Sequence, residues 1–387
     1  MFIDIDCIQK KKYDQHICGD YFISKRYPEI GRLIAVLSDG LGSGIKANIL
    51  SCMTSTMMLK FTEAGKDIQK ASEIILESLP ICRIRKISYA TFSAVDCNEE
   101  GDVKIVEEGN PQFVWIRDLK VIQPEFRIIS SKKFNDRNMH IYNIKVKEND
   151  RLIFCSDGVT QAGLGTEKLK LGLRREGLIG IITDILKQNP EISSRKLSKN
   201  IISAALQKEE KLLIKDDISA MCMFFRTPRQ ALVFTGPPYY SDKDNFYAKI
   251  FQNFKGKKAI CGGTTANLIS RELKIPVQNE TFIPSGNLPP TSYMEGVNLV
   301  TEGILTLTKA YEYLDSAEPV VNNDPAGRLV NFLLDTDCIT FMIGAKINQA
   351  HYDPNLPVEI EIRKNVVKKI AKVLEEKFIK KITFQYM

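Results

Sequence analysis

Hydrophobic and polar residues along positions 1–226 follow two different periods. Short apolar runs bounded by turn residues predict strands, and apolar residues recurring every three or four positions predict helices. The strands expected on this basis lie at 21–25, 32–38, 89–95, 103–106, 113–117, 141–146, 151–155 and 218–225. The helices expected lie at 45–64, at 68–79 and within a helical stretch over about 178–208. Two sheets flanked by paired helices account for this order of elements.

A hairpin and two amphipathic helices are the best defined of these elements. Turn residues at 27–31 join strands 21–25 and 32–38 in a hairpin. The first helix carries an apolar stripe with two methionines, which we expect to pack in the core rather than to bind a ligand. Its members are Ile49, Leu50, Met53, Met57 and Phe61. The second helix has a similar stripe at Ile68, Ala71, Ile75 and Leu79.

A domain junction is indicated at 226–230, where a proline and charged residues separate two strand-like runs. The chain is therefore divided into domains at 1–226 and 227–387, and the second has the pattern of an α/β domain. Its expected strands lie at 231–235, 258–261, 338–343 and at 297–300, a run that the following helix can also include. Its expected helices lie at 245–254, 265–273, 302–314, 327–334 and, as a basic amphipathic helix, within 363–381.

Composition places the chain among ordinary globular proteins. A length of 387 residues suits two domains, and 44% apolar with 26% charged residues is neither disordered nor fibrous. No stretch approaches the roughly 20 apolar residues of a membrane span, and Asp4 and Asp6 stand where a signal peptide would carry lysines. Nine cysteines occur without a CxxC pair, which fits a reducing compartment. We expect a cytoplasmic protein with no membrane partner, and the mild net charge of +7 makes nucleic acid an unlikely one.

Four aspartates lie where expected strands begin or end. Asp39 and Asp157 each follow a strand, whereas Asp20 and Asp216 each precede one. In an antiparallel hairpin the start of the first strand lies beside the end of the second, so Asp20 and Asp39 are neighbours if their hairpin forms. The same holds for Asp157 and Asp216 if their strands pair. A single Asp-Gly after a strand is usually only a turn, but four such acids together indicate a site.

Carboxylates gathered at one end of two sheets repel one another unless a cation neutralises them. Oxygen ligands without a nearby histidine or cysteine favour Mg²⁺ or Mn²⁺ over zinc. A cluster of this kind can hold two ions roughly 3.5–4 Å apart, which polarise a phosphoryl oxygen and acidify a shared water. Gly40 and Gly158 would let the backbone approach the ions. The residues therefore indicate a site for divalent metal ions.

At these residues the chain resembles the metal-dependent protein phosphatases, the PPM family, and within it the bacterial branch similar to stage II sporulation protein E. The matching segments are Gly19-Asp20-Tyr21, Ser38-Asp39-Gly40-Leu41-Gly42-Ser43-Gly44, Gly109-Asn110-Pro111, Ser156-Asp157-Gly158-Val159-Thr160 and Asp216-Asp217-Ile218-Ser219. Their order and spacing agree over about 1–225. The resemblance implies an αββα sandwich for the phosphatase domain at 1–226. The expected fold class is thus α+β, with the smaller α/β domain following.

The resemblance also implies a role for each acid. Asp39 should bridge two Mn²⁺ or Mg²⁺ ions, with the Gly40 carbonyl as a further ligand. Asp20 should serve the outer ion, and Asp157 and Asp216 the inner one. The implied reaction is hydrolysis of phosphoserine or phosphothreonine by a hydroxide bridging the two ions, without a phosphoenzyme. The two helices after Asp39 should lie beside the site, where they could gate it.

Three positions limit this transfer. Asp217 stands where relatives often have asparagine, so we expect it to support the ligands rather than to be one. Leu41 replaces a histidine that eukaryotic relatives use toward the leaving group. No N-terminal arginine is present to grip phosphate, and Lys46 and the lysines at 10–12 are weak substitutes. The general acid therefore stays unassigned, with metal-bound water as the default.

Two other functions are weighed against a phosphatase. Residues 42–47 match a dinucleotide-binding fingerprint, but Asp39 would bring a negative charge to the pyrophosphate, and a helix replaces the expected second strand. No GxxxxGK[ST] loop is present, which argues against a P-loop enzyme. The remaining alternative is a catalytically weak scaffold or binding protein that acts through its C-terminal domain. Release of phosphate that depends on Mn²⁺ distinguishes an enzyme from it.

Gly262, Gly263, Thr264 and Thr265 follow an apolar strand and open a helix. Backbone N–H groups at such a place can cradle an anion, although a tight turn with a threonine N-cap is the simpler explanation. We expect the second domain to be regulatory or ligand-binding, with a small anionic or phosphorylated ligand. A phosphorylated protein substrate and a second copy of the chain complete the expected partners.

Overall fold

The computed structural model describes residues 1–78, 90–130, 138–279, 288–316, 324–344 and 356–387. The chain divides into two compact units, Met1–Thr227 and Pro228–Met387. This division lies one residue beyond the predicted boundary between 226 and 227. Two residues at the ends of predicted elements, Leu79 and Tyr89, lie outside the described residues. None of the described helices is long and apolar enough to cross a membrane.

The first unit is a sandwich of two antiparallel sheets. Sheet A has the strand order β1-β11-β10-β6-β7, and sheet B has the order β2-β3-β4-β5-β9-β8. The strands of sheet A are β1 (Phe2–Lys10), β6 (Val114–Arg117), β7 (Lys120–Ile122), β10 (Arg151–Cys155) and β11 (Ile218–Arg226). Those of sheet B are β2 (Tyr21–Tyr27), β3 (Arg32–Gly40), β4 (Ala90–Asn98), β5 (Asp102–Glu108), β8 (Arg127–Ser130) and β9 (Asn138–Lys145).

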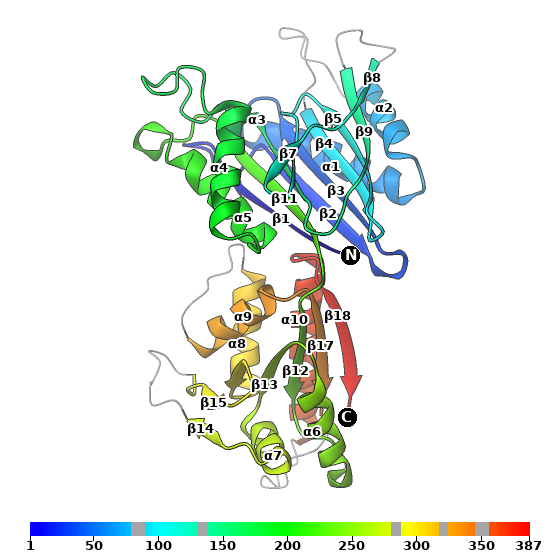
Figure 1. Cartoon of the computed structure of the whole chain (residues 1–387), viewed down its shortest axis with the longest axis vertical. Coiled ribbons are helices and arrows are strands. Elements are labelled where there is room, and N and C mark those ends of the chain that lie inside the picture. The colour runs from blue at the N-terminus through cyan, green and yellow to red at the C-terminus, as the bar shows by residue number, and fades with distance from the viewer. Residues whose placement is uncertain (79–89, 131–137, 280–287, 317–323, 345–355) are drawn as a thin grey trace. The chain divides into compact units, whose positions relative to one another are not determined.

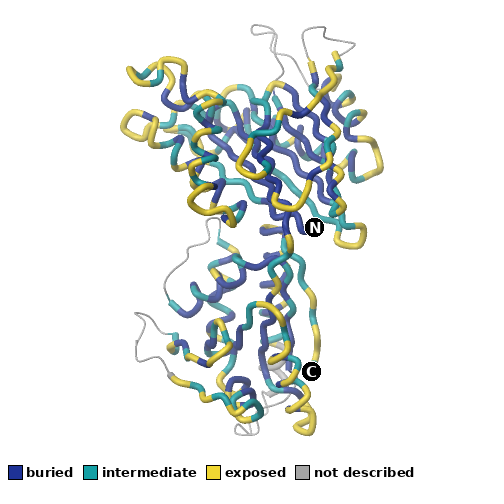
Figure 2. The backbone as a smooth tube through the Cα atoms, in the orientation of Figure 1, coloured by how far each residue is buried: buried dark blue, intermediate teal, exposed yellow. Residues whose placement is uncertain are grey.

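Helices cover the outer face of each sheet (Figure 1). Helices α1 (Gly44–Glu63) and α2 (Ile68–Ser78) pack on sheet B. Helices α4 (Arg174–Gln188) and α5 (Ser194–Leu206) pack on sheet A, and the short α3 (Asp157–Thr160) directly follows β10. Figure 2 shows buried backbone along the strands and exposed backbone on the outer helices. This layering confirms the predicted αββα sandwich.

An aromatic cluster joins the two sheets inside the sandwich. The ring of Phe113, next to β6, stacks on Phe154 of β10 with 5.3 Å between centroids. It meets Tyr142 of β9 edge-on at 5.0 Å. Because the inner faces meet each other and the outer faces meet helices, central strands such as β10 and β11 are buried at every position. Strands buried on both faces are apolar runs rather than alternating ones, which is why the sequence pattern revealed them.

The buried side of α1 differs from the predicted stripe. Ile49 and Met53 are each 51% exposed, whereas Met58 on the other side of the helix is fully buried. The buried side consists mainly of small residues, namely Gly44, Ala47, Ser51, Thr54, Ser55, Met58, Leu59 and Thr62. They are needed because α1 runs close to β3, so that a Cβ at Gly40 would lie 2.1 Å from the Ala47 carbonyl oxygen. The predicted stripe therefore belongs to the core only in part, since Ile49 and Met53 are exposed whereas Met57 and Phe61 pack against the core. The predicted stripe on α2 is buried at its described positions, Ile68, Ala71 and Ile75.

Strand β1 is absent from the sequence prediction. It pairs with β11 along its whole length, from Phe2 opposite Arg226 to Lys10 opposite Ile218. Its acids have structural partners, since Asp4 forms an ion pair with Arg226 at 3.2 Å. The acids Asp4 and Asp6 thus belong to an edge strand of sheet A.

The second unit contains a mostly parallel sheet in the order β14-β15-β16-β13-β12-β17-β18. Its strands are β12 (Gln230–Thr235), β13 (Lys257–Cys261), β14 (Val277–Asn279), β15 (Ser292–Met294), β16 (Leu299–Thr301), β17 (Cys338–Ile343) and β18 (Lys381–Tyr386). Two pairs, β14–β15 and β15–β16, are antiparallel, and the other pairs are parallel. The five parallel strands have the order 3-2-1-4-5 along the chain, which is the doubly wound α/β arrangement, and the order reverses between β12 and β17.

Helices cover both faces of this sheet. They are α6 (Asp244–Asn253), α7 (Gly263–Leu273), α8 (Ile304–Asp315), α9 (Pro325–Leu334) and α10 (Leu356–Glu376). Helices α8, α9 and α10 share one core, and α6 and α7 share the core on the other face. The predicted apolar stripe near the C-terminus belongs to the first of these cores, with Val367, Ile370, Val373, Leu374 and Phe378 buried. The unit is an α/β fold, as predicted.

Candidate metal centre

Strand pairing in sheet B brings Asp20 and Asp39 together. Strands β2 and β3 form the predicted hairpin, with Tyr21 opposite Ser38. Asp20 comes one residue before Tyr21 and Asp39 one residue after Ser38, so the two aspartates stand across from each other where the pairing continues. On its other side Asp39 pairs with Thr91 of β4. The predicted proximity of Asp20 and Asp39 follows from this register.

Strand pairing in sheet A places Asp157 and Asp216 at one end of that sheet. Strands β10 and β11 are antiparallel neighbours, and the backbone N–H of Ser156 donates to the Ser219 carbonyl at 3.1 Å. Asp157 then begins α3, and Asp216 lies two residues before β11 begins. The strands pair as expected, and both acids lie where the β10–β11 ladder ends.

Asp20 links the two sheets. Its Oδ2 accepts a hydrogen bond from the Ser219 hydroxyl of sheet A at 2.6 Å. That hydroxyl also accepts a hydrogen bond from Gln9 Nε2 at 3.1 Å. Asp20 is 2% exposed, and its Oδ1 has no hydrogen-bond partner. A buried carboxylate oxygen without a donor is unfavourable unless a cation or a donor reaches it.

Helix α1 holds the segment before Asp20. Asn48 Nδ2 donates to the Cys18 carbonyl at 2.8 Å, and the Ser51 hydroxyl donates to the Gly19 carbonyl at 2.5 Å. The small residues on the buried side of α1 therefore position a candidate ligand as well as packing on β3.

The glycines that follow Asp39 and Asp157 admit neighbouring backbone. A Cβ at Gly40 would meet the carbonyl of α1 described above, and a Cβ at Gly158 would lie 2.1 Å from the Asp217 carbonyl oxygen. Only glycine fits such approaches. These glycines were predicted to let the backbone approach metal ions. The structure shows that they also have a packing role, which the sequence did not predict.

Asp217 is more buried than Asp216 beside it. It is 3% exposed, and its Oδ1 accepts a hydrogen bond from the Lys12 backbone N–H at 2.9 Å. Its Oδ2 has no partner, although it lies 2.7 Å from the position of a Cβ at Gly19. The Asp217 N–H donates to Asp216 Oδ1 at 2.9 Å. Asp217 therefore orients Asp216 through its backbone.

The four carboxylates influence one another electrostatically. Burial raises the pKa of Asp39 far above its usual range, and the charges of Asp20, Asp157 and Asp216 raise it further. Burial also raises the pKa of Asp20, against the hydrogen bond from Ser219. The pKa of Asp216 is raised by burial and by the charge of Asp157. A raised pKa means that the surroundings do not compensate the negative charge.

These features fit divalent cations. A cation would satisfy the buried Asp20 Oδ1 and would relieve the repulsion around Asp39. The donors are all carboxylate oxygens, which Mg²⁺ and Mn²⁺ prefer. Within the described ranges, no three His, Cys, Asp or Glu side chains are grouped as a ready-made metal site. The case for a metal centre rests on strand register, burial and electrostatics rather than on a closed set of ligands.

Several polar residues near the aspartates received no role from the sequence. Gln161 Nε2 donates to Asp157 Oδ2 at 2.8 Å, and Ser219 binds Asp20. Asn110 binds β3 and β4 through its side-chain amide. Ser219 and Asn110 lie within the quoted motif segments, so a role could have been assigned there. For Gln161 the signal was its spacing of four residues from Asp157 at a helix start.

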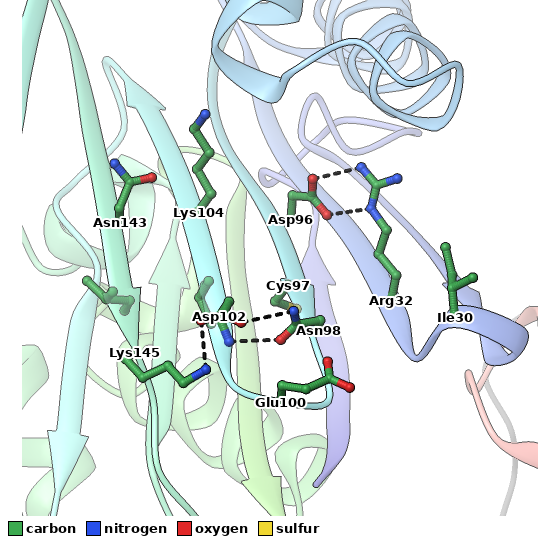
Figure 3. Close-up of a pocket in the computed structure, with 12 residues that line it drawn as sticks. Ile30, Arg32, Asp96, Cys97, Asn98, Glu100, Asp102, Lys104, Asn143 and Lys145 are labelled. Atoms are coloured by element: carbon green, nitrogen blue, oxygen red, sulfur yellow. Dashed lines mark hydrogen bonds and ion pairs between the residues drawn. The ribbon is translucent and has the colours of Figure 1, made fainter.

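A cavity of about 610 Å³ lies at the opposite end of sheet B (Figure 3). Arg32, which lines it, begins β3, and Asp39 lies seven positions further along the strand, or roughly 23 Å away. Arg32 pairs with Asp96 at 2.7 Å, and Lys145 pairs with Asp102 at 2.7 Å. Because these charges neutralise one another far from the aspartates, this cavity is not the candidate site.

Residues 29–226 match the family model of stage II sporulation protein E, SpoIIE. The match spans just over half of the 387 residues. The chain belongs to the SpoIIE family. Asp39, Asp157 and Asp216 fall inside the matched residues, and Asp20 precedes them. The SpoIIE region of the chain forms a protein phosphatase domain of the metal-dependent class.

Several solved structures are similar to this SpoIIE-family chain at low identity. The RsbU and RsbW domains of a Mycobacterium tuberculosis protein are 15% identical with a TM-score of 0.48, covering 65% of this chain and 67% of that one. The PP2C phosphatase domain of SpoIIE from Bacillus subtilis, with a fragment of its regulatory domain, is 17% identical with a TM-score of 0.48, covering 58% and 62%. RsbX in complex with magnesium is 20% identical with a TM-score of 0.39, covering 57% and 94%. No curated protein matches the chain.

Proposed function

We propose that this chain is a phosphoprotein phosphatase that hydrolyses phosphoserine or phosphothreonine with two Mn²⁺ or Mg²⁺ ions. The observation that carries the proposal is the hydrogen bond of 2.6 Å from the Ser219 hydroxyl of sheet A to Asp20, which stands across from Asp39 at the end of sheet B. The raised pKa of Asp39, caused by burial and by the charges of Asp20, Asp157 and Asp216, supports a shared site. Membership of the SpoIIE family supports the same chemistry.

Each aspartate has a proposed role. Asp39 would serve both ions, and the Gly40 carbonyl would be a further ligand. Asp20 would hold one ion, while Asp157 and Asp216 would hold the other. When bound, such ions polarise the phosphoryl group and lower the pKa of water. The chain itself supplies the fixed orientation of the carboxylates, which is what positions substrate and ions for reaction.

Hydrogen bonds to the aspartates fix their orientation. The Ser219 hydroxyl donates to Asp20 at 2.6 Å, and Gln161 Nε2 donates to Asp157 at 2.8 Å. Each donor uses one carboxylate oxygen and leaves the other for an ion. Asp217 acts behind Asp216 in this proposal, as a group that places the ligand.

We infer that a second cavity, which adjoins the segment bound to Asp217, receives part of the phosphoprotein. It has a volume of about 540 Å³ and is lined by residues 11–16 with Leu212 and Ile214. The backbone of Lys12 connects it to Asp217. Lys11 and Lys12 bring positive charge to this cavity, which favours a phosphorylated substrate.

We also place the protein in the cytoplasm, because each cysteine within the described residues is a free thiol.

Release of phosphate from a phosphoserine peptide, measured with and without Mn²⁺, tests the proposal. We expect Asp39→Asn and Asp157→Asn to lose at least about 100-fold in metal-dependent turnover, because each removes a charged ligand. Asp184→Asn is the matched control, since this aspartate on α4 is 74% exposed. Wild-type turnover in both site variants would contradict the assignment. A folded wild-type chain that binds Mn²⁺ without releasing phosphate would favour a scaffold instead.

A further inference from the structure

Two helices of the second unit begin side by side at the carboxyl edge of its parallel sheet. Helix α7 follows β13 and α8 follows β16, and these strands are parallel neighbours. Gly262 and Gly303 are the N-caps of the two helices. The Gly262 N–H donates to the Thr301 carbonyl at 2.9 Å, and a Cβ at Gly303 would lie 3.7 Å from the Gly262 Cα. Glycine backbone therefore forms the surface between the two helix starts.

Both helix starts contain buried polar groups without partners. Neither N-cap offers a side chain to the N–H groups of the first turn. Thr265 and Thr306 are the third residues of α7 and α8, and they are 2% and 0% exposed. Neither hydroxyl has a hydrogen-bond partner. Thr265 Oγ1 lies 3.3 Å from the position of a Cβ at Gly262, so it faces the start of its helix. Two such hydroxyls at equivalent positions indicate a shared ligand.

A carboxylate lies at the same edge. Glu302 occupies the connection between β16 and α8, and its Oε2 is buried without a partner. The charge of Glu302 adds to burial in raising the pKa of the Cys261 thiol, against a hydrogen bond from Thr301. The carboxylate therefore lies near the end of β13. It requires a hydrogen-bond donor that the described residues do not supply.

The position in the fold is that of ligand sites in other open α/β sheets, which lie outside the carboxyl ends of the strands. Thr235 ends β12, beside the point where strand order reverses, and pairs with Cys261 of β13. It is fully buried, and its hydroxyl also lacks a partner. Unpartnered polar atoms thus occur at the ends of three adjacent strands, β16, β13 and β12.

We propose that this edge of the second unit binds a nucleoside phosphate. The phosphate accepts hydrogen bonds from the first-turn N–H groups of α7 and α8 and from the hydroxyls of Thr265 and Thr306. A ribose hydroxyl donates to Glu302. Gly262 has a φ of +137°, and with Gly263 it leaves the backbone open to the phosphate. Inorganic phosphate would leave Glu302 without a donor, and an uncharged sugar would leave the helix starts without an acceptor.

Isothermal titration of the full chain with AMP, ADP and inorganic phosphate tests this proposal. Excess EDTA is present throughout, so that divalent ions at the aspartates of the first unit cannot hold phosphate. We expect a nucleotide to bind, and inorganic phosphate to bind at least about tenfold more weakly. Thr265→Val and Thr306→Val should each weaken nucleotide binding at least about tenfold. Glu302→Gln should weaken nucleotide binding and leave phosphate binding unchanged.

Thr308→Val provides the control, because this half-buried threonine lies on α8 away from the helix start. It should bind nucleotide as the wild type does. Thr265→Val and Thr306→Val should also unfold at the wild-type temperature or above, since the hydroxyls they remove have no partner. Absence of nucleotide binding, or binding that all three site variants leave unchanged, would overturn the proposal. Equal affinity for inorganic phosphate and AMP would overturn it as well, because Glu302 would then contribute nothing.

Discussion

The buried negative charge of Asp39 destabilises the metal-free fold, but the same charge favours the binding of divalent ions. Burial and three neighbouring carboxylates raise the pKa of this side chain, so its charge opposes folding when no cation is bound. The same crowding is what makes the place attractive to divalent ions. A single substitution can therefore separate the two effects, because asparagine keeps the shape of aspartate and loses its charge.

Asp39→Asn should stabilise the metal-free protein. Without the penalty on the charge, its melting temperature in EDTA at pH 8 should exceed that of the wild type by at least about 2 °C. Addition of Mn²⁺ should raise the melting temperature of the wild type more than that of the variant, because bound ligand stabilises the native state. Differential scanning calorimetry measures both shifts. A variant less stable than the wild type in EDTA would contradict the electrostatic account.

Glu107 should make stability depend on pH. Burial raises its pKa to about 8, although its Oε1 accepts hydrogen bonds from the Phe113 N–H at 3.2 Å and the Ser93 hydroxyl at 3.3 Å. The stability that this carboxyl contributes is complete below the usual pKa of 4.5 and is lost as pH rises through about 8. Urea unfolding of Glu107→Gln should show a smaller loss of stability between pH 5.5 and 8.5 than the wild type. Equal losses in the two proteins would contradict this.

Helix α1 shows at the scale of one element what hydrophobic periodicity can and cannot predict. Its limits, Gly44–Glu63, lie within one residue of the predicted 45–64. Its buried side was predicted only in part, because contact with Gly40 and with the Cys18–Gly19 backbone requires small side chains. Close approach of two backbones leaves no signal in a scale of hydrophobicity, so the predicted stripe omits these small residues and includes Ile49 and Met53, which are exposed.

Two methionines on α1 provide a matched test of its orientation. Met58→Ala should cost about 2–5 kcal/mol of unfolding free energy, because Met58 is fully buried against sheet B. Met53→Ala should change it by less than about 1 kcal/mol, because Met53 is 51% exposed. Urea denaturation of both variants measures these two changes in the free energy of unfolding. Equal costs would mean that the helix has another orientation.

Strands were predictable where burial on both faces or a clear turn marked them. The β2–β3 hairpin and β17 follow the predicted limits closely. Strand β1 was not predicted because Asp4 and Asp6 interrupt its apolar pattern. Their partners, such as Arg226, lie far along the chain. The short strands β14 and β15 have three residues each, too few for a period to show.

At the scale of the whole molecule, the sequence predicted the α+β class and the aspartates as candidate ligands. The motif segments supplied those acids, and strand register explains why Asp20 and Asp39 adjoin. Contacts that depend on long-range folding, such as Ser219 with Asp20, could not be derived from local pattern. The same holds for the unpartnered groups of the second unit, which appear only once its strand order is known.

The first unit should be sufficient for phosphatase activity. All four aspartates and both cores of the sandwich lie within Met1–Thr227. A fragment of these residues should unfold cooperatively and retain metal-dependent release of phosphate from a phosphoserine peptide. The complementary fragment, Pro228–Met387, should release none. An inactive but folded first fragment would show that the second unit takes part in the reaction.

Anomalous diffraction from crystals soaked in Mn²⁺ tests the central claim most directly. The account predicts Mn²⁺ peaks bound by the carboxylates of Asp20, Asp39, Asp157 and Asp216, with Asp39 in contact with both ions. Peaks only at other residues, or no peak beside Asp39 in crystals of an active protein, would contradict it.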